Sequence, residues 1–375
     1  MMIYNEFKGL KLSALGMGTM RLPLIDGKND QIDEAASAKM IAVAMECGIN
    51  YYDTAWGYHD GNSEIVMGKL LSEYPRDSFY LASKFPGYDL ANMEKIQEVF
   101  EKQLEKCQVE YFDFYLIHNV CEKNVDAYLD EKYGLLNYLL EQKAKGKIRH
   151  LGFSTHASFE QFKRFLDAYG EHMEFCQIQL NYLDWFLQRA CDKVELLNER
   201  NIPIWVMEPL RGGKLSTLSE WATASLLELR PDEKVPAWAF RYLQSVPGVK
   251  VILSGMSNEE QILDNVRTFE CDCPLNDREM SVLMDIAEKM VAGVPCTACR
   301  YCTSYCPQAL DIPKLLELYN EHSFSQGGFL APMYLGTLPV EKQPSACIGC
   351  RSCEAVCPQK IKISETLADF ATKLK

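Results

Sequence analysis

Two groups of four cysteines near the C-terminus have the residue type and spacing of a metal site. Each group follows the pattern C-x2-C-x2-C-x3-C and is followed directly by proline. Cysteine thiolates are soft ligands that suit zinc and iron–sulfur clusters, and zinc sites also use C-x2-C pairs. Three cysteines at this interval, then x3 and proline, are rare for zinc, so the pattern favours iron. The groups are Cys296, Cys299, Cys302 and Cys306, and Cys347, Cys350, Cys353 and Cys357.

This spacing resembles the bacterial ferredoxin motif for [4Fe–4S] clusters, in which the fourth cysteine of each run ligates the other cluster. The resemblance therefore implies two [4Fe–4S] clusters with crossed ligands. The 40 residues between the groups include a predicted helix, which is similar to the α-helical ferredoxin modules of multi-subunit oxidoreductases. One cluster would take Cys296, Cys299, Cys302 and Cys357, and the other would take Cys347, Cys350, Cys353 and Cys306.

A second group of ionisable residues lies in the N-terminal part of the chain. Residues 53–68 contain D-T-A-x-x-Y, then S-E and G, and this segment resembles the signature of the aldo-keto reductases. These are NAD(P)-dependent barrel enzymes with a catalytic Asp, Tyr, Lys and His. The resemblance covers roughly residues 3–267 and implies NADH- or NADPH-dependent reduction of a small aldehyde or ketone. The four catalytic types fall on Asp53, Tyr58, Lys84 and His118.

The chemistry expected of these four residues follows from what carbonyl reduction requires. The carbonyl carbon must receive a hydride and the oxygen a proton. Tyrosine has a pKa of about 10 and is a weak acid at neutral pH, but a neighbouring ammonium lowers that pKa. We therefore expect Lys84 to lower the pKa of Tyr58 and Asp53 to hold Lys84, while His118 contacts the substrate oxygen. His59 and His156 are alternative histidines for ligand contact.

The same resemblance implies contacts to a nicotinamide cofactor at several strand ends. Glycines in the segment 208–213 would let backbone N–H groups approach a pyrophosphate. Met207 stands where relatives usually have an aromatic ring against the nicotinamide. Relatives often place Lys or Arg within a stretch matching 253–265 to hold a 2′-phosphate, and this stretch has none, which leaves NADH and NADPH both open. The implied contacts are Gly18, Thr19, Met20, Ser154, Gln177, Met207, Pro209, Leu210, Arg211, Gly212, Ser254, Gly255, Ser257, Gln261 and Asn265.

Short β-rich runs alternate with amphipathic helical runs from residue 16 to about 267. Eight strands, each followed by a helix, predict a (β/α)8 TIM barrel, in which catalytic residues lie at the C-terminal ends of the strands. Residues 3–15 predict a hairpin that closes the bottom of the barrel. The strands are expected to begin near Gly16, Asn50, Phe79, Tyr111, Ile148, Phe175, Ile202 and Lys250.

The composition changes after a predicted helix at residues 276–290, where Gly293-Val294-Pro295 breaks the helix and cysteine becomes frequent. We predict that residues 1–290 form the aldo-keto-reductase-like barrel. Residues 291–375 are predicted to form a small, mostly α-helical ferredoxin-like domain with two [4Fe–4S] clusters. Its expected helices cover residues 311–319 and 364–374.

Charge and leader sequence restrict the partners and the compartment. The formal net charge of −13 argues against nucleic acid and anionic membranes as main partners. The N-terminus has no apolar leader and the chain no run of about 18 apolar residues, which predicts a cytoplasmic protein without a membrane span. In that setting the remaining cysteines are expected to be buried reduced thiols. They are Cys47, Cys107, Cys121, Cys176, Cys191, Cys271 and Cys273.

The two predicted domains pose a problem of electron counting. Nicotinamide transfers two electrons as a hydride, whereas a cluster passes electrons singly, and no flavin signature links the two. Three hypotheses follow. The clusters are structural beside an ordinary carbonyl reductase, or they relay electrons from a ferredoxin or flavoprotein partner to a substrate in the barrel. Alternatively, the chain is an iron–sulfur electron-transfer or redox-sensing subunit whose barrel no longer uses nicotinamide.

Overall fold

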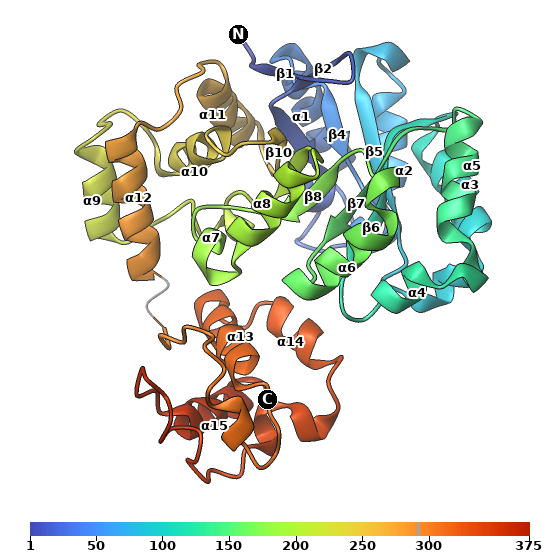
Figure 1. The fold of residues 1–375 in the computed structure, drawn as a ribbon. Helices are drawn as coiled ribbons and strands as arrows, with labels where there is room; N and C mark the ends of the chain where they lie inside the picture. Colours follow the sequence, from blue (N-terminus) through green and yellow to red (C-terminus); the bar gives the residue numbers. More distant parts are fainter. Residues whose placement is uncertain (291–292) are drawn as a thin grey trace. The chain divides into compact units, whose positions relative to one another are not determined.

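The computed structural model describes residues 1–290 and 293–375, which form two compact units (Figure 1). The first unit contains Met1–Tyr182 and Cys191–Leu283, and the second contains Leu183–Ala190 and Met284–Lys375. The domain boundary between residues 290 and 291 stays a prediction, and residue 291 lies outside the described residues. Within the part of the chain that the structure describes, no helix combines the length and apolar character needed to cross a bilayer.

The first unit is built around a closed barrel of parallel strands in the order β10-β3-β4-β5-β6-β7-β8-β9. This confirms the predicted (β/α)8 fold, and each strand begins within two residues of its expected start. Apolar side chains line the barrel, while the polar residues predicted for the site lie at or after strand ends. The strands are β3 (Leu15–Gly18), β4 (Tyr51–Asp53), β5 (Tyr80–Phe85), β6 (Phe112–Val120), β7 (Ile148–Thr155), β8 (Cys176–Gln179), β9 (Ile204–Met207) and β10 (Val249–Ser254).

Helices connect successive strands of the barrel, and two more follow the last strand. The first of them begins where the Asp33 side chain accepts a hydrogen bond from the Ala36 amide at 2.9 Å, which satisfies a free N–H at the helix start. The helices are α1 (Glu34–Glu46), α2 (Ser63–Leu71), α3 (Ile96–Cys107), α4 (Val125–Leu129), α5 (Leu135–Ala144), α6 (Phe159–Tyr169), α8 (Ala190–Glu199), α9 (Glu220–Leu227), α10 (Val235–Gln244), α11 (Glu259–Phe269) and α12 (Asp277–Met290).

An antiparallel hairpin of β1 (Tyr4–Phe7) and β2 (Leu10–Ser13) precedes the barrel, as predicted. Its Phe7 ring is buried and lies edge-on against Trp205, with ring centroids 5.1 Å apart. Phe7 and Leu12 belong to one apolar cluster with residues of β4, β5, β6, β9 and β10. Because the contacted rings lie toward the starts of their strands, the hairpin closes the barrel at the end opposite the polar residues.

Helices α2 and α3 pack closely at Gly68, the last residue of the segment 53–68. A Cβ atom at Gly68 would lie 2.3 Å from the carbonyl oxygen of Lys106 and 2.6 Å from the carbonyl carbon of Cys107. We expect Gly68→Ala to lower the free energy of unfolding of the barrel by about 1–3 kcal/mol, because backbone atoms cannot rotate away as side chains do. Urea unfolding followed by circular dichroism measures the change.

The matched control for this substitution is Gly170→Ala. Gly170 has right-handed φ and ψ of −57° and −33°, and an added Cβ would meet its nearest neighbours at 3.5 Å, an ordinary contact distance. We expect the control to change the unfolding free energy by less than about 0.5 kcal/mol. Equal effects of the two substitutions would contradict the close-packing argument.

The second unit is mostly helical, as predicted, and consists of α13 (Ile312–Ser325), α14 (Leu330–Leu335), α15 (Ile363–Lys373), the short α7 (Asp184–Leu187) and irregular cysteine-bearing loops. Leu316, Leu367 and Phe370 lie in its apolar core. Helix α7 contacts α13, and Gln188 donates a hydrogen bond to the Glu321 carboxylate at 3.3 Å. Residues 183–190 therefore pack with a segment more than 120 residues later in the chain.

Candidate active site and cluster sites

A buried ion pair joins the ends of β4 and β5. The Lys84 ammonium is fully buried and donates to the Asp53 carboxylate at 2.5 Å and to the Thr54 carbonyl at 2.8 Å. Asp53 and Lys84 come together because β4 and β5 are adjacent parallel strands, with Asp53 beside Ala82 in the register. A buried charge is costly without a partner, so each of these groups requires the other.

Tyr58 and His118 lie next to this pair. The Lys84 nitrogen is 5.0 Å from the centroid of the Tyr58 ring, within the range of a cation–π contact. The His118 ring stands edge-on to Tyr58, with centroids 6.2 Å apart, and to Tyr88 at 5.2 Å. Tyr58 begins the short 3-10 turn Tyr58–Gly61 after β4, and His118 lies near the end of β6. The four residues expected to be catalytic therefore meet at one end of the barrel.

The charge states at this site follow from burial and from the lysine. Attraction to Asp53 and Tyr58 outweighs burial and raises the pKa of Lys84, so the ammonium is retained. Burial raises the pKa of Asp53, and Lys84 opposes that rise. Burial and the charge of Lys84 hold the pKa of His118 well below its usual value, so its ring is neutral.

The pKa of Tyr58 depends on two opposing effects, of which the expected influence of Lys84 is one. Lys84 does lower the pKa of Tyr58, but burial raises that pKa by more, so the net shift is upward. Removing the phenolate from water costs more than the single neighbouring ammonium returns. Tyr58 is therefore a protonated phenol at neutral pH, the form that has a proton to donate.

A buried carboxylate outside the predicted site positions the strand that carries Lys84. Glu64 of α2 accepts hydrogen bonds from Ser83 and Gln103, both at 2.6 Å, and forms an ion pair with Lys106 at 2.8 Å. Gln103 also donates to the Lys84 carbonyl at 3.0 Å. These contacts fix the backbone of Ser83 and Lys84 from the helix side of the barrel, so Glu64 positions the site without reaching into it.

The alternative histidines are held by the surrounding chain. His59 is buried, and its two ring nitrogens lie 3.2 Å and 3.1 Å from the carbonyl oxygens of Asn29 and Thr19. These contacts connect the turn after β4 to the loop after β3, which is a structural task. Burial, and next Lys193, lower the pKa of His156 to about 4, so this ring is neutral as well.

The residues expected to contact a nicotinamide cofactor lie within or after β3, β7, β8, β9 and β10. Ser154 and Gln177 are register partners on adjacent strands. The Gln177 amide nitrogen faces the Met207 sulfur at 3.8 Å, and its buried oxygen has no hydrogen-bond partner among the described residues. Asn265 donates to the Ser254 hydroxyl at 3.1 Å. An unsatisfied buried acceptor of this kind suits an amide N–H of a ligand.

Other predicted contacts are engaged within the protein. The Thr19 hydroxyl donates to the Asp53 carbonyl at 3.0 Å, whereas Met20 is exposed. Gln261 accepts from the Ser257 amide at 2.7 Å. The segment after β9 forms the 3-10 turn Arg211–Gly213, in which Gly212 has a φ of +66° that favours glycine. Pro209 and Leu210 precede this turn, and Gly255 directly follows β10.

Arg21 is a cation near these residues that no sequence motif indicated. It follows Thr19 and Met20 in the loop after β3, and its side chain lies along two predicted phosphate-binding segments. A Cβ at Gly212 would lie 3.2 Å from its guanidinium, and one at Gly255 would lie 3.1 Å from its Cδ. The Ser257 hydroxyl donates to the Arg21 carbonyl at 2.8 Å. Closure of the barrel brings β3 beside β10, so Arg21 lies near the segments that follow β9 and β10.

The eight cluster cysteines line two hollows of the second unit. Apolar side chains complete both, including Leu316 and Ile363 in the first and Leu310 and Leu367 in the second. Cys299 and Cys350 are exposed, whereas Cys302 and Cys353 are buried. The first hollow is lined by Cys296, Cys299, Cys302 and Cys357, and the second by Cys306, Cys347, Cys350 and Cys353. The structure thus brings together the two crossed sets.

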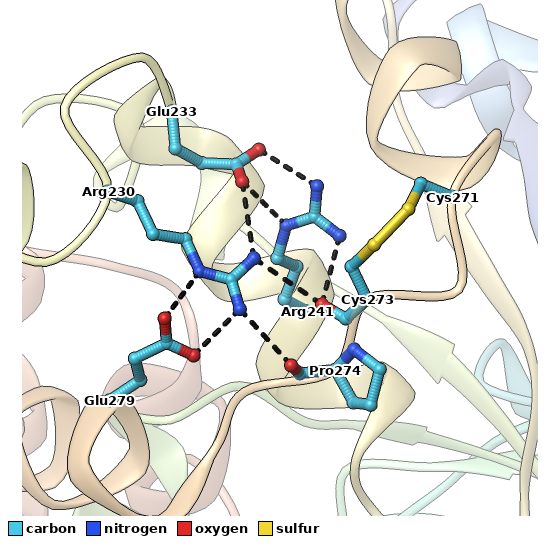
Figure 2. The surroundings of a disulfide bond; sticks show 7 residues. All are labelled: Arg230, Glu233, Arg241, Cys271, Cys273, Pro274 and Glu279. Atoms are coloured by element: carbon cyan, nitrogen blue, oxygen red, sulfur yellow. Dashed lines mark hydrogen bonds and ion pairs between the residues drawn. A yellow bond between two sulfur atoms is a disulfide. The ribbon is translucent and has the colours of Figure 1, made fainter.

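The remaining cysteines differ in part from the expected buried thiols. Cys107, Cys121 and Cys176 are buried, and burial raises the pKa of each thiol. Cys47 and Cys191 are half-buried. The expectation was wrong for Cys271 and Cys273, which form a disulfide bond in the loop between α11 and α12 (Figure 2). Cys271 and Asp272 are exposed and Cys273 is half-buried, so the pair lies outside the apolar core.

Comparisons with known proteins agree with both units. The model of the "Aldo/keto reductase family" matches residues 14–288, and the model of a "4Fe-4S dicluster domain" matches residues 295–361. The NADH-specific methylglyoxal reductase of Escherichia coli is 24% identical over 327 residues, covering 75% of this chain and 96% of the relative. L-galactose dehydrogenase of Arabidopsis thaliana is 26% identical over 280 residues, covering 69% of this chain and 84% of the relative.

A similar solved structure is the holo form of an aldo-keto reductase from Bacillus halodurans. It superposes with a TM-score of 0.63 at 26% identity, covering 76% of this chain and 96% of that one. The similarity thus extends over nearly the whole of that protein.

Proposed function

Because the chain belongs to the aldo/keto reductase family, we propose that it reduces a small aldehyde or ketone with NADH or NADPH. Membership of this family makes the protein an oxidoreductase. The observation that carries the proposal is the buried Lys84–Asp53 pair at 2.5 Å, with the Lys84 nitrogen 5.0 Å from the Tyr58 ring centroid. An ammonium held in this way favours proton loss from a neighbouring phenol and has no comparable use in packing the barrel.

In the proposed reaction Tyr58 is the general acid. Its phenol donates a proton to the carbonyl oxygen, and the Lys84 ammonium stabilises the phenolate that remains. Asp53 keeps Lys84 charged and in place. His118, which is neutral, offers a ring N–H to the same oxygen and so orients the substrate. The bound nicotinamide supplies the hydride for the carbonyl carbon.

Three features support a nicotinamide cofactor at this end of the barrel. The unsatisfied Gln177 oxygen suits the carboxamide N–H, with the Ser154 hydroxyl beside it. The positive φ of Gly212 exposes backbone N–H groups to a pyrophosphate. Arg21, lying between the two segments that follow β9 and β10, supplies a positive charge for phosphate. We propose that Arg21 takes the place of the basic residue missing from 253–265.

We propose that the two hollows of the second unit hold [4Fe–4S] clusters, each through its four cysteines. Thiolates in mainly apolar surroundings suit such clusters, which supply one-electron chemistry when bound. Exposure of Cys299 and Cys350 places one ligand of each set at the surface, where a ferredoxin or flavoprotein partner can reach it, so a structural and an electron-relaying role must be separated by experiment. The meeting of Asp53, Tyr58, Lys84 and His118 argues against a redox-sensing subunit without nicotinamide chemistry.

Anaerobic titration with NADH and then NADPH, followed through the visible absorption of the clusters, separates these roles. Without a carbonyl substrate we expect no bleaching, because a hydride delivers two electrons together and a cluster accepts one at a time. With a panel of small aldehydes and ketones, we expect the near-ultraviolet absorbance of the reduced nicotinamide to fall while the visible absorption of the clusters stays constant.

The control is a cluster-free variant, Cys299→Ala with Cys350→Ala, assayed with the same carbonyl substrates. Turnover preserved in this variant would support barrel chemistry that is independent of the clusters. Bleaching of the wild-type protein by nicotinamide alone would instead demonstrate electron transfer between barrel and clusters. Absence of nicotinamide oxidation with every carbonyl tested would overturn the proposed function.

A further inference from the structure

The Cys271–Cys273 disulfide lies outside both sites described above, in the loop between α11 and α12 of the barrel unit. Only Asp272 separates the two cysteines, and Cys271 and Asp272 are exposed. In the chain-entropy account a disulfide stabilises a fold by restricting the unfolded chain, and the effect grows with the size of the closed loop. A bond across one residue restricts the unfolded chain least, so stabilisation does not explain this pair.

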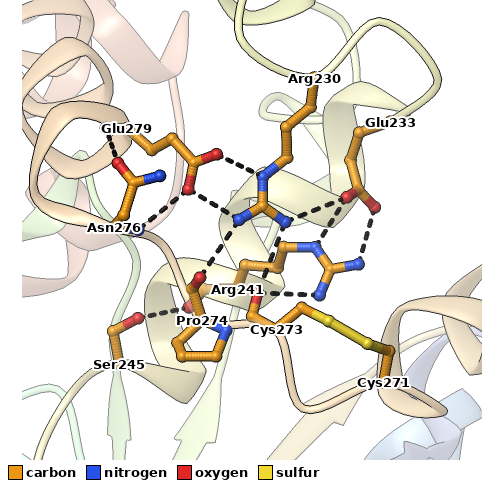
Figure 3. A network of polar contacts seen from close by, with 9 residues as sticks. All are labelled: Arg230, Glu233, Arg241, Ser245, Cys271, Cys273, Pro274, Asn276 and Glu279. Carbon is orange, nitrogen blue, oxygen red and sulfur yellow. Dashed lines mark hydrogen bonds and ion pairs between the residues drawn. A yellow bond between two sulfur atoms is a disulfide. The ribbon is translucent and has the colours of Figure 1, made fainter.

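Two arginines hold the loop at the same point (Figures 2 and 3). The Cys273 carbonyl accepts from Arg241 at 3.1 Å and from Arg230 at 3.5 Å, and the Pro274 carbonyl accepts from Arg230 at 3.2 Å. Arg241 lies in α10, and Arg230 precedes that helix. The guanidinium groups therefore bind the backbone of the disulfide loop itself.

Two carboxylates complete this network. Arg230 donates two hydrogen bonds to Glu279, both at 2.7 Å, and Arg241 donates two to Glu233 at 2.8 Å and 3.1 Å. Paired hydrogen bonds of this kind are among the strongest polar contacts in proteins. Glu279 also accepts from the Asn276 amide at 2.9 Å, while Asn276 accepts from the Glu279 amide at 3.0 Å. This reciprocal cap begins α12, so the network joins the disulfide loop to the start of that helix.

We propose that Cys271 and Cys273 form a reversible redox site whose state is coupled to the arginine–carboxylate network at the start of α12. The reductant is a dithiol. One of its thiolates attacks a sulfur of the pair, the Cys271–Cys273 bond breaks, and a mixed disulfide forms. The second thiol of the reductant then displaces the protein sulfur. Two electrons and two protons pass to the protein, which leaves Cys271 and Cys273 as thiols and the reductant as a disulfide.

The disulfide and the arginine–carboxylate network are coupled through the carbonyl groups of the disulfide loop. The closed disulfide limits the conformations of the loop, so the Cys273 and Pro274 carbonyls need less ordering to meet the guanidinium groups. The open dithiol loop must lose more conformational freedom to make the same contacts. The disulfide and the network therefore favour one another, and by linkage the effect is reciprocal. Weakening the network must favour the dithiol, and reduction must loosen the start of α12.

The sequence allows the redox state of this pair to be read separately from all other cysteines. Trypsin cleaves after Arg267 and Arg278, which releases residues 268–278 with Cys271 and Cys273 as their only cysteines. The full-length, cluster-loaded protein is equilibrated anaerobically with reduced and oxidised dithiothreitol in varied ratio. It is then quenched in denaturant with an alkylating reagent, and the peptide is weighed by mass spectrometry. We expect the doubly alkylated fraction to rise and fall reversibly with the ratio.

Two outcomes would overturn the redox site. A peptide that is doubly alkylated at every ratio would show that the disulfide does not form in the folded protein. A peptide that stays unalkylated at every ratio would show a structural bond closed to exchange.

Coupling is tested with Arg241→Lys, which keeps the charge but loses the paired hydrogen bonds. At a given ratio of reduced to oxidised dithiothreitol, we expect the dithiol-to-disulfide ratio of the pair to rise at least about 5-fold. This factor is the lower end of typical coupling between two sites. Lys102→Met, which breaks an exposed pair with Glu105, is the control and should leave the ratio unchanged. If Arg241→Lys fails to fold, Glu279→Gln tests the same network. An unchanged ratio in the folded variant would overturn the coupling.

Discussion

Replacing Tyr58 with phenylalanine is expected to lower kcat for carbonyl reduction by about 10²–10⁴-fold, the contribution typical of a general acid. The variant keeps the ring that lies 5.0 Å from the Lys84 nitrogen and loses only the hydroxyl group that carries the proton. Burial keeps that phenol protonated in the resting protein, so its removal takes away the proton source. The measurement is anaerobic turnover with NADH or NADPH.

Two controls separate loss of catalysis from loss of structure. The visible absorption and iron content of the Tyr58→Phe protein should match those of the wild type. Tyr4→Phe makes the same chemical change in the β1–β2 hairpin, where the hydroxyl donates to the Gly48 carbonyl at 2.8 Å, and should leave turnover within about 2-fold. Undiminished turnover in Tyr58→Phe would remove Tyr58 from the mechanism.

The second large effect concerns the crossed arrangement of the cluster cysteines. Cys306 and Cys350 belong to different sequence motifs but line the same hollow. We therefore expect Cys306→Ala with Cys350→Ala to remove one cluster, or about four of eight iron atoms per chain. Cys302 and Cys306 share a motif but line different hollows, so Cys302→Ala with Cys306→Ala is expected to disturb both clusters. Iron analysis of anaerobically purified protein measures both results.

If each cluster were instead held by the four cysteines of one sequence motif, the two double variants would have the opposite effects. In that case the first double variant would lose both clusters and the second only one. Cys47→Ala, which removes a half-buried thiol of the barrel unit, serves as the control for cysteine loss and should retain all the iron.

Much of the barrel was predictable because its signals are local. Each strand is a short apolar run between turns, and the polar residues Asp53, Lys84 and His118 fall at or near strand ends. The rule that parallel strands end at one rim was therefore enough to bring them together. The spacing of the cluster cysteines is equally local, and the dicluster family match confirms what it indicated.

The features that were missed depend on distant parts of the chain. Arg21 approaches Gly212 and Gly255 only because the barrel closes β3 against β10. The net pKa shift of Tyr58 depends on how deeply the folded chain buries the phenol, which no motif records. The Cys271–Cys273 bond depends on the conformation of one loop. The expectation of reduced thiols was based on the cysteines as a group and did not include that conformation.

The excursion of residues 183–190 into the second unit has a consequence for synthesis on the ribosome. Gln188 is synthesised 133 residues before its partner Glu321. At typical rates of elongation, roughly 7–27 s pass between the synthesis of the two residues. During that time the segment after β8 lacks α13, the helix against which α7 packs. Completion of the loop after β8 must therefore wait for the C-terminal part of the chain, so the protein cannot mature strictly from its N-terminus to its C-terminus.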